Sequence, residues 1–109
     1  MGITKSEIFT EDQNKLAQLA KVLGHPARIS ILQHIFQLNS CVCGELVDEI
    51  GLAQATISQH LRELKDIELI KGSIEGTSVC YCINQEKWNE MKSIITLFLN
   101  QTASNDNCC

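Results

Sequence analysis

The spacing of apolar residues predicts a mainly helical protein. Over most of the 109 residues they recur every three or four positions, which is typical of amphipathic helices. Thr10 and Gln13 match a capping box, in which each side chain accepts a hydrogen bond from the other residue's backbone N–H at a helix start. The predicted helices cover residues 10–24, 25–38, 42–50, 54–67 and 85–101.

One stretch departs from this spacing. Two β-prone runs, residues 69–74 and 78–83, flank the turn signal Glu75-Gly76 and predict a hairpin. The predicted fold class is therefore mainly α with a β-hairpin wing, in the winged helix-turn-helix order of four helices, two strands and a last helix. Residues 10–101 form the predicted domain, residues 1–9 a loose N-terminal arm, and residues 102–109 a flexible tail.

The last predicted helix is apolar around nearly its whole circumference in its second half, which includes Leu97, Phe98 and Leu99. A single small subunit cannot bury such a helix. We therefore expect a partner subunit to cover it.

The fourth predicted helix has a polar face in the position of a recognition helix. Base edges or phosphates are the predicted targets of Gln54, Thr56, Ser58, Gln59 and His60. Arg62 and Lys65 are expected to neutralise phosphates, and Lys71, Ser73 and Thr77 are the candidates on the wing. The alternative is a merely solvated face. The formal net charge of −4 argues mildly against nucleic-acid binding, but a local basic face acts within a Debye length of about 10 Å.

The chain resembles a known family in three runs: GHPARISIL, CVCGELVDEIGLAQATISQHLRELKDIELI and GTSVCYCIN. Over about residues 10–100 it is similar to the ArsR/SmtB family of bacterial metal-sensing repressors. The resemblance implies a homodimer built on the first and last helices. Such a dimer binds palindromic double-stranded operator DNA and leaves it when a soft metal or metalloid binds. Two departures are Ala53 and Ala55, where the family commonly has serine, and Glu75-Gly76-Thr77, where its wing often carries arginine.

The chain contains six cysteines: Cys41, Cys43, Cys80, Cys82, Cys108 and Cys109. It has no apolar leader and no apolar run of the ~20 residues that span a bilayer, so we expect a cytoplasmic bacterial protein without a membrane partner. Thiols, metal ligands or redox switches are then expected rather than a disulfide framework.

Cys41 and Cys43 are the predicted metal ligands. In a regular helix they would project about 200° apart, so binding one ion requires an extended or unwound segment. The family resemblance places them at a thiolate site for arsenite or antimonite, or alternatively cadmium or lead. It also places Leu46 where arsenite sensors often have a third cysteine.

Two further cysteine pairs leave alternatives open. Cys80 and Cys82 share one face of a predicted strand, where they either form a second dithiol site or pack as small hydrophobic residues. Cys108 and Cys109 lie on the tail and are the weakest candidate ligands. The three histidines are poor zinc candidates, and no permanent cofactor is expected.

Three functional hypotheses follow. The first is a repressor of a metal(loid)-resistance operon that arsenite or antimonite releases from its operator. The second is a thiol-based redox or persulfide sensor on the same scaffold, with Cys41/Cys43 or Cys80/Cys82 oxidised. The third is a thiol enzyme or metal carrier that binds no DNA. No thiol is paired with an evident general base, which favours a regulator over an enzyme.

Overall fold

The computed structural model describes residues 5–43, 50–73 and 80–104. The secondary structure runs in the order η1 (Lys5–Ile8), α1 (Glu11–Leu23), α2 (Pro26–Leu38), β1 (Val42–Cys43), α4 (Gln54–Asp66), β2 (Ile70–Ser73), β3 (Cys80–Ile83) and α5 (Gln85–Leu99). The helix predicted over residues 42–50 begins too early, because Val42 and Cys43 form a strand. Ile50 is helical, and residues 44–49 lie outside the described part of the chain.

The helix starts follow from local side-chain chemistry. At α1 the capping box is present: the backbone N–H of Gln13 donates to Thr10 Oγ1 at 3.1 Å, and that of Thr10 donates to Gln13 Oε1 at 2.9 Å. At α2, proline occupies the first turn. A backbone N–H at this position has no acceptor within the helix, so the N–H that proline lacks costs no hydrogen bond. At α4, by contrast, the N-cap is Ala53, whose side chain makes no capping hydrogen bond.

The strands form an antiparallel sheet in the order β1-β3-β2. The β2–β3 pairing confirms the predicted hairpin, with Ile70 opposite Ile83 and Gly72 opposite Tyr81. Gly72 has a φ of +127°, and an added Cβ would overlap the backbone of Cys80 and Tyr81. Glycine is therefore required at this point of the wing.

The core lies where α2 and α4 pack against the sheet. Ile31, Leu64, Leu69 and Tyr81 are fully buried at its centre. The Tyr81 hydroxyl has no hydrogen-bond partner among the described residues, and burial raises the pKa of Tyr81 to about 12.

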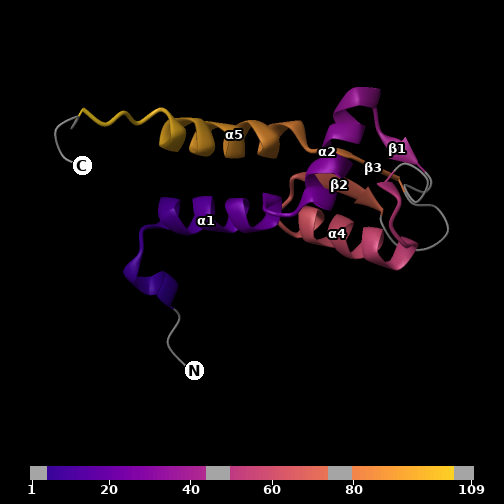
Figure 1. Cartoon of the computed structure of the whole chain (residues 1–109), viewed down its shortest axis with the longest axis horizontal. Coiled ribbons are helices and arrows are strands. Elements are labelled where there is room, and N and C mark those ends of the chain that lie inside the picture. The colour runs from indigo at the N-terminus through magenta and orange to yellow at the C-terminus, as the bar shows by residue number, and fades with distance from the viewer. Residues whose placement is uncertain (1–4, 44–49, 74–79, 105–109) are drawn as a thin grey trace.

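Helices α1 and α5 contact each other and project together from one side of this core (Figure 1). Helix η1 and the end of α5 lie on the side away from the sheet (Figure 1). Large apolar side chains remain exposed near these ends: Ile8, Phe9, Leu97, Phe98 and Leu99. Among the described residues, no helix has the length and apolar character needed to cross a membrane.

Candidate DNA-binding face and cysteine pair

Helix α4 presents a polar strip to solvent. Of the residues predicted to contact DNA, those exposed on this helix are Thr56, Gln59, Arg62 and Lys65. The opposite face is anchored by Ile57, Leu61 and Leu64, each no more than 1% exposed. A buried apolar stripe thus fixes the rotation of the helix and points this strip away from the core.

Gln54 and Ser58 are only partly exposed at the start of the same helix. Gln54 Nε2 donates to Ser58 Oγ at 3.2 Å, and Gln54 Oε1 is buried without a hydrogen-bond partner in the part of the chain that the structure describes. On the wing, Lys71 and Ser73 are exposed on β2. Thr77 lies outside the described residues.

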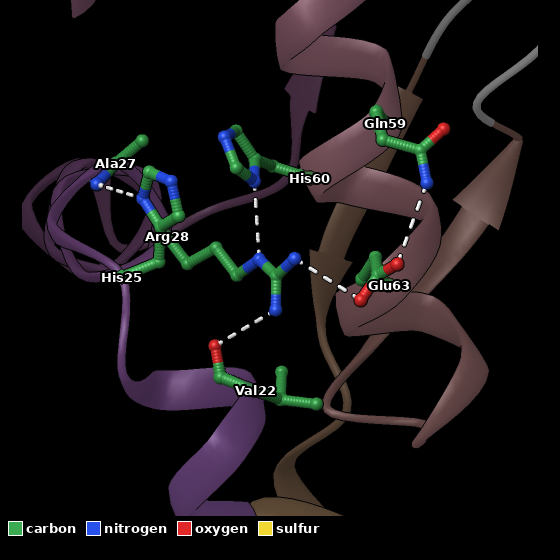
Figure 2. Close-up of polar contacts among 7 residues, drawn as sticks. All are labelled: Val22, His25, Ala27, Arg28, Gln59, His60 and Glu63. Carbon is green, nitrogen blue, oxygen red and sulfur yellow. Dashed lines mark hydrogen bonds and ion pairs between the residues drawn. The ribbon is translucent and has the colours of Figure 1, made fainter.

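His60 does not belong to the exposed strip. The prediction that it reaches base edges or phosphates is wrong, because its side chain is only 7% exposed and faces α2. The ring of His25 lies beside it, with the two ring centroids 4.3 Å apart (Figure 2). His60 therefore helps to attach α4 to the rest of the domain.

Arg28 holds α4 against the start of α2 (Figure 2). Its Nε donates to His60 Nδ1 at 3.0 Å, and its Nη2 forms an ion pair with Glu63 Oε2 at 3.0 Å. A third hydrogen bond runs from Nη1 to the carbonyl oxygen of Val22 at 3.2 Å. One guanidinium thus joins the end of α1, the start of α2 and the middle of α4. We call this set of contacts the Arg28 network.

The environment of His60 favours its neutral form. Burial is the largest cause that lowers its pKa, followed by His25 and Arg28, while Glu63 acts in the opposite sense. The hydrogen bond from Arg28 requires a lone pair on Nδ1 of His60. The lowered pKa and the hydrogen bond from Arg28 therefore both favour a neutral His60 ring without a proton on Nδ1.

Neither Arg28 nor Glu63 was singled out as a functional residue on sequence grounds. The available signal was a charged residue among apolar ones: Arg28 stands within PARISIL, and Glu63 lies between Leu61 and Leu64. Such positions are buried only when the charge has partners.

The structure pairs Cys41 with Cys82 in a disulfide, with their Cα atoms 4.3 Å apart. Cys41 lies just before β1 and is exposed, whereas Cys82 lies on β3 and is partly buried. Cys80 is disulfide-bonded as well, and the residue opposite it in the β1–β3 ladder is Cys43. The expectation that these cysteines would not be paired in disulfides is therefore wrong at Cys41, Cys80 and Cys82, and their role as redox switches stays a prediction.

A small cavity of about 170 Å³ adjoins the Cys41–Cys82 pair. Its wall comes from the end of α2 and the start of α5, and includes Phe36, Asn39 and Gln85. The described residues contain no group of three or more His, Cys, Asp or Glu side chains placed to hold a metal ion. Cys108 and Cys109 lie outside the described part of the chain.

Comparisons with known proteins show that the chain is similar to transcriptional regulators. Residues 25–71 match the family model described as bacterial regulatory protein, arsR family. An HTH-type transcriptional regulator of Methanocaldococcus jannaschii is 35% identical over 86 residues, which cover 78% of this chain and 96% of that protein.

Two relatives carry a more specific name. The arsenical resistance operon repressor of Staphylococcus xylosus is 32% identical over 72 residues, covering 66% of this chain and 68% of that protein. The arsenical resistance operon repressor of Bacillus subtilis is 29% identical over 110 residues and covers both chains completely.

Proposed function

Because the chain belongs to the ArsR family of bacterial regulatory proteins, we propose that it represses a metal(loid)-resistance operon and leaves its operator when a soft thiophilic ion binds its cysteines. The predicted family, the winged helix-turn-helix fold and the role of DNA-binding transcription repressor are all confirmed. The operon, the inducing ion and the residues that bind each ligand are proposals, and the bacterial cytoplasm is the proposed location.

The exposed strip on α4 carries the DNA-binding proposal. A recognition helix in the major groove needs an outward polar face on a rigidly held helix. In α4, Thr56 and Gln59 supply hydrogen-bonding groups for base edges, and Arg62 and Lys65 supply positive charge for phosphates. Lys71, Ser73 and Thr77 are the proposed wing contacts, and Gln54 and Ser58 supplement the helix start.

A homodimer is the proposed binding form. Leu97, Phe98 and Leu99 are each more than half exposed at the end of α5, and Ile8 and Phe9 are more than half exposed before α1. Exposed apolar groups of this size mark association surfaces. Two-fold pairing through these ends would leave both α4 helices free for half-sites about 34 Å apart on a palindromic operator.

The dimer is tested by sedimentation equilibrium. Leu97→Glu should yield monomers at concentrations where the wild type is dimeric, because a charge would be buried in the interface. Gln33→Glu adds the same charge on the exposed surface of α2, outside the proposed dimer contacts, and serves as the matched control. If the wild type is a monomer at the concentrations that occupy the operator, the proposed binding form is wrong.

Salt dependence of operator binding tests the DNA-contacting face. Fluorescence anisotropy is measured with reduced protein and a DNA duplex from upstream of its own gene. Since each phosphate contact contributes about −0.9 to the log–log salt slope, Arg62→Gln should flatten the slope by about 1.8 for a dimer. Lys21→Gln, which removes one exposed positive charge from α1, should change the slope much less. Equal effects of the two substitutions would contradict the assignment.

Arsenite or antimonite is the proposed inducer, with cadmium or lead as the alternatives. Two relatives named as arsenical resistance operon repressors support this choice, and the thiol that reduction would free at the exposed residue Cys41 suits a soft ion. Arsenite should weaken operator binding by the equivalent of about 1–3 kcal/mol, a typical coupling energy. Cys41→Ser should abolish that response and leave operator affinity without arsenite unchanged.

A second candidate function is favoured by the Cys41–Cys82 disulfide. In this version oxidation itself, by peroxide or persulfide, is the signal that releases the operator. Titrating operator binding with peroxide in the absence of arsenite separates the two candidates, with mass spectrometry reporting the bond. Release by peroxide alone would favour a redox sensor, whereas unchanged affinity after complete oxidation would exclude it.

A further inference from the structure

The disulfide joins two residues that face each other across the β1–β3 ladder. Val42 pairs with Tyr81 in this antiparallel ladder, so the same register sets Cys41 opposite Cys82. Their 4.3 Å Cα separation matches the closer type of antiparallel pair, which lacks hydrogen bonds and has a Cα spacing of about 4.5 Å. Side chains alternate along a strand: Tyr81 is buried in the core, and its neighbours Cys80 and Cys82 remain partly exposed.

This geometry favours ion binding across the strands over binding along β1. Two sulfurs that bind the same ion, each at about 2.3 Å, lie no more than about 4.6 Å apart. Residues two apart on one strand, such as Cys41 and Cys43, have backbones about 6.7 Å apart. The opposed pair starts from 4.3 Å and therefore needs the smaller rearrangement.

The surroundings of the pair suit a small polar ligand. The cavity of about 170 Å³ lies directly beside both sulfur-bearing residues. Asn39, Ser40 and Gln85 provide polar groups in its wall, and Phe36 provides an apolar side. Cys41 is exposed, so a dissolved ion or oxidant reaches the pair without unfolding of the core.

We infer that Cys41 and Cys82 form a cross-strand dithiol site for one trivalent arsenite-class ion, and that their disulfide closes this site. The inference rests on the proposed function and assigns Cys82, in place of Cys43, as the second sulfur beside Cys41. In the reduced state, As(OH)3 and two thiols give a dithiolate As–OH complex and two waters. With hydrogen peroxide as oxidant, the two thiols give the disulfide and two waters.

Reopening requires a reductant. A small dithiol reduces the bond by exchange, which yields the two protein thiols and its own cyclic disulfide. The same two sulfurs cannot bond to each other and bind an ion, so arsenite affinity depends on the redox state.

Three matched full-length variants test which sulfurs form the site. Each keeps two cysteines and changes the other four to serine. The opposed variant keeps Cys41 and Cys82, the diagonal variant keeps Cys41 and Cys80, and the along-strand variant keeps Cys41 and Cys43. Diagonal neighbours across two strands are about 7–8 Å apart, beyond the usual reach of a disulfide.

Arsenic per protomer is measured after gel filtration of protein incubated with arsenite. The reduced opposed variant should retain one arsenic per protomer. Its affinity for arsenite should be about 100-fold above that of the other two variants, because only its two sulfurs lie close enough to bind the same arsenic atom. After peroxide treatment it should retain none. It should also lose two hydrogens in mass and link tryptic peptides 29–62 and 72–87, which the diagonal variant should not do.

A second measurement on the wild type does not depend on the folding of variants. Arsenite should protect Cys41 and Cys82 from alkylation more than Cys43, as fragment-ion spectra of each peptide report. Tight binding by the along-strand variant alone, or equal binding by the oxidised and reduced opposed variant, would overturn the inference.

Operator binding separates this inference from the proposed function. If arsenite releases wild-type protein from DNA but the opposed variant binds none, the repressor function stands and the cross-strand site is wrong. If the opposed variant binds arsenite and wild-type protein stays on DNA, the site stands and arsenite is not the inducer.

Discussion

Replacing Arg28 with methionine should detach α4 from the start of α2. Methionine keeps much of the aliphatic stem but removes every donor of the Arg28 network. The substitution leaves Nδ1 of His60 without its hydrogen bond in a position that is only 7% exposed. It also leaves the Glu63 carboxylate without its cation and the Val22 carbonyl without its side-chain donor.

The size of the effect follows from these contacts. The hydrogen bonds to His60 and Val22 contribute about 1 kcal/mol each, and the buried acceptor left on His60 costs about 1 kcal/mol more. The ion pair adds only about 0.5 kcal/mol, since the Glu63 side chain is 41% exposed and water screens it. We therefore expect a loss of about 3.5 kcal/mol, which lowers Tm by roughly 15 °C in a domain of this size.

Urea unfolding followed by circular dichroism measures this loss, at fixed protein concentration and with reductant present so that no disulfide contributes. Glu63→Gln removes only the charge and should cost no more than about 0.5 kcal/mol. Lys21→Met deletes an exposed cation on α1 and should be nearly neutral. If Arg28→Met costs no more than Lys21→Met, the Arg28 network does not hold α4 in place.

Three further predictions concern stability. Gly72→Ala should cost about 2–4 kcal/mol in urea unfolding, because its Cβ overlaps the Cys80 backbone, whereas Gly51→Ala, with φ +85° and open space, should cost about 1 kcal/mol of backbone strain alone. His60 has a folded-state pKa below its ordinary 6.5, so its contribution should be complete above pH 6.5 and lost as pH falls through the folded-state pKa. His60→Gln should flatten that part of the pH–stability curve, and an unchanged curve would contradict the assignment. Ala53→Ser should raise stability by about 1 kcal/mol by supplying the missing cap, and no gain in Tm would mean that another group already satisfies that helix start.

Features controlled by neighbouring residues were predictable from the sequence. The capping box at Thr10 and Gln13 depends on residues three apart, and the hairpin depends on a short turn between β-prone runs. The buried position of His60 could also have been predicted from the sequence, because His60 borders the apolar stripe that Ile57, Leu61 and Leu64 form along the helix. The prediction that His60 contacts DNA followed from its hydrogen-bonding groups alone, whereas its position on the helix places it on the buried face.

Features set by distant pairs were not predictable in this way. β1 has two residues and exists through its pairing with β3, which no local propensity encodes. The Cys41–Cys82 bond joins positions separated by 41 residues, and Arg28 contacts Glu63 across 35 residues. Nearness in the sequence therefore suggested Cys41 with Cys43, while the register between strands sets Cys41 opposite Cys82.

Helix α2 lies next to both of these distant contacts, at its opposite ends. Arg28 at its start binds α4, and the cavity beside Cys41 and Cys82 is walled by Phe36 and Asn39 at its end. Phe36 and Asn39 lie 8 and 11 positions after Arg28, about 12–17 Å along the helix axis, and Ile31 and Ile35 pack the helix into the core between them. Continuity of packing alone does not establish energetic coupling, so the test is a thermodynamic one. If α2 transmits the effect of arsenite binding from the cysteines to α4, the Arg28→Met variant should still bind arsenite normally at a temperature where it is folded. Arsenite should then lower its operator affinity less than it lowers that of the wild type. An undiminished effect would assign transmission to another route, such as β3 and α5.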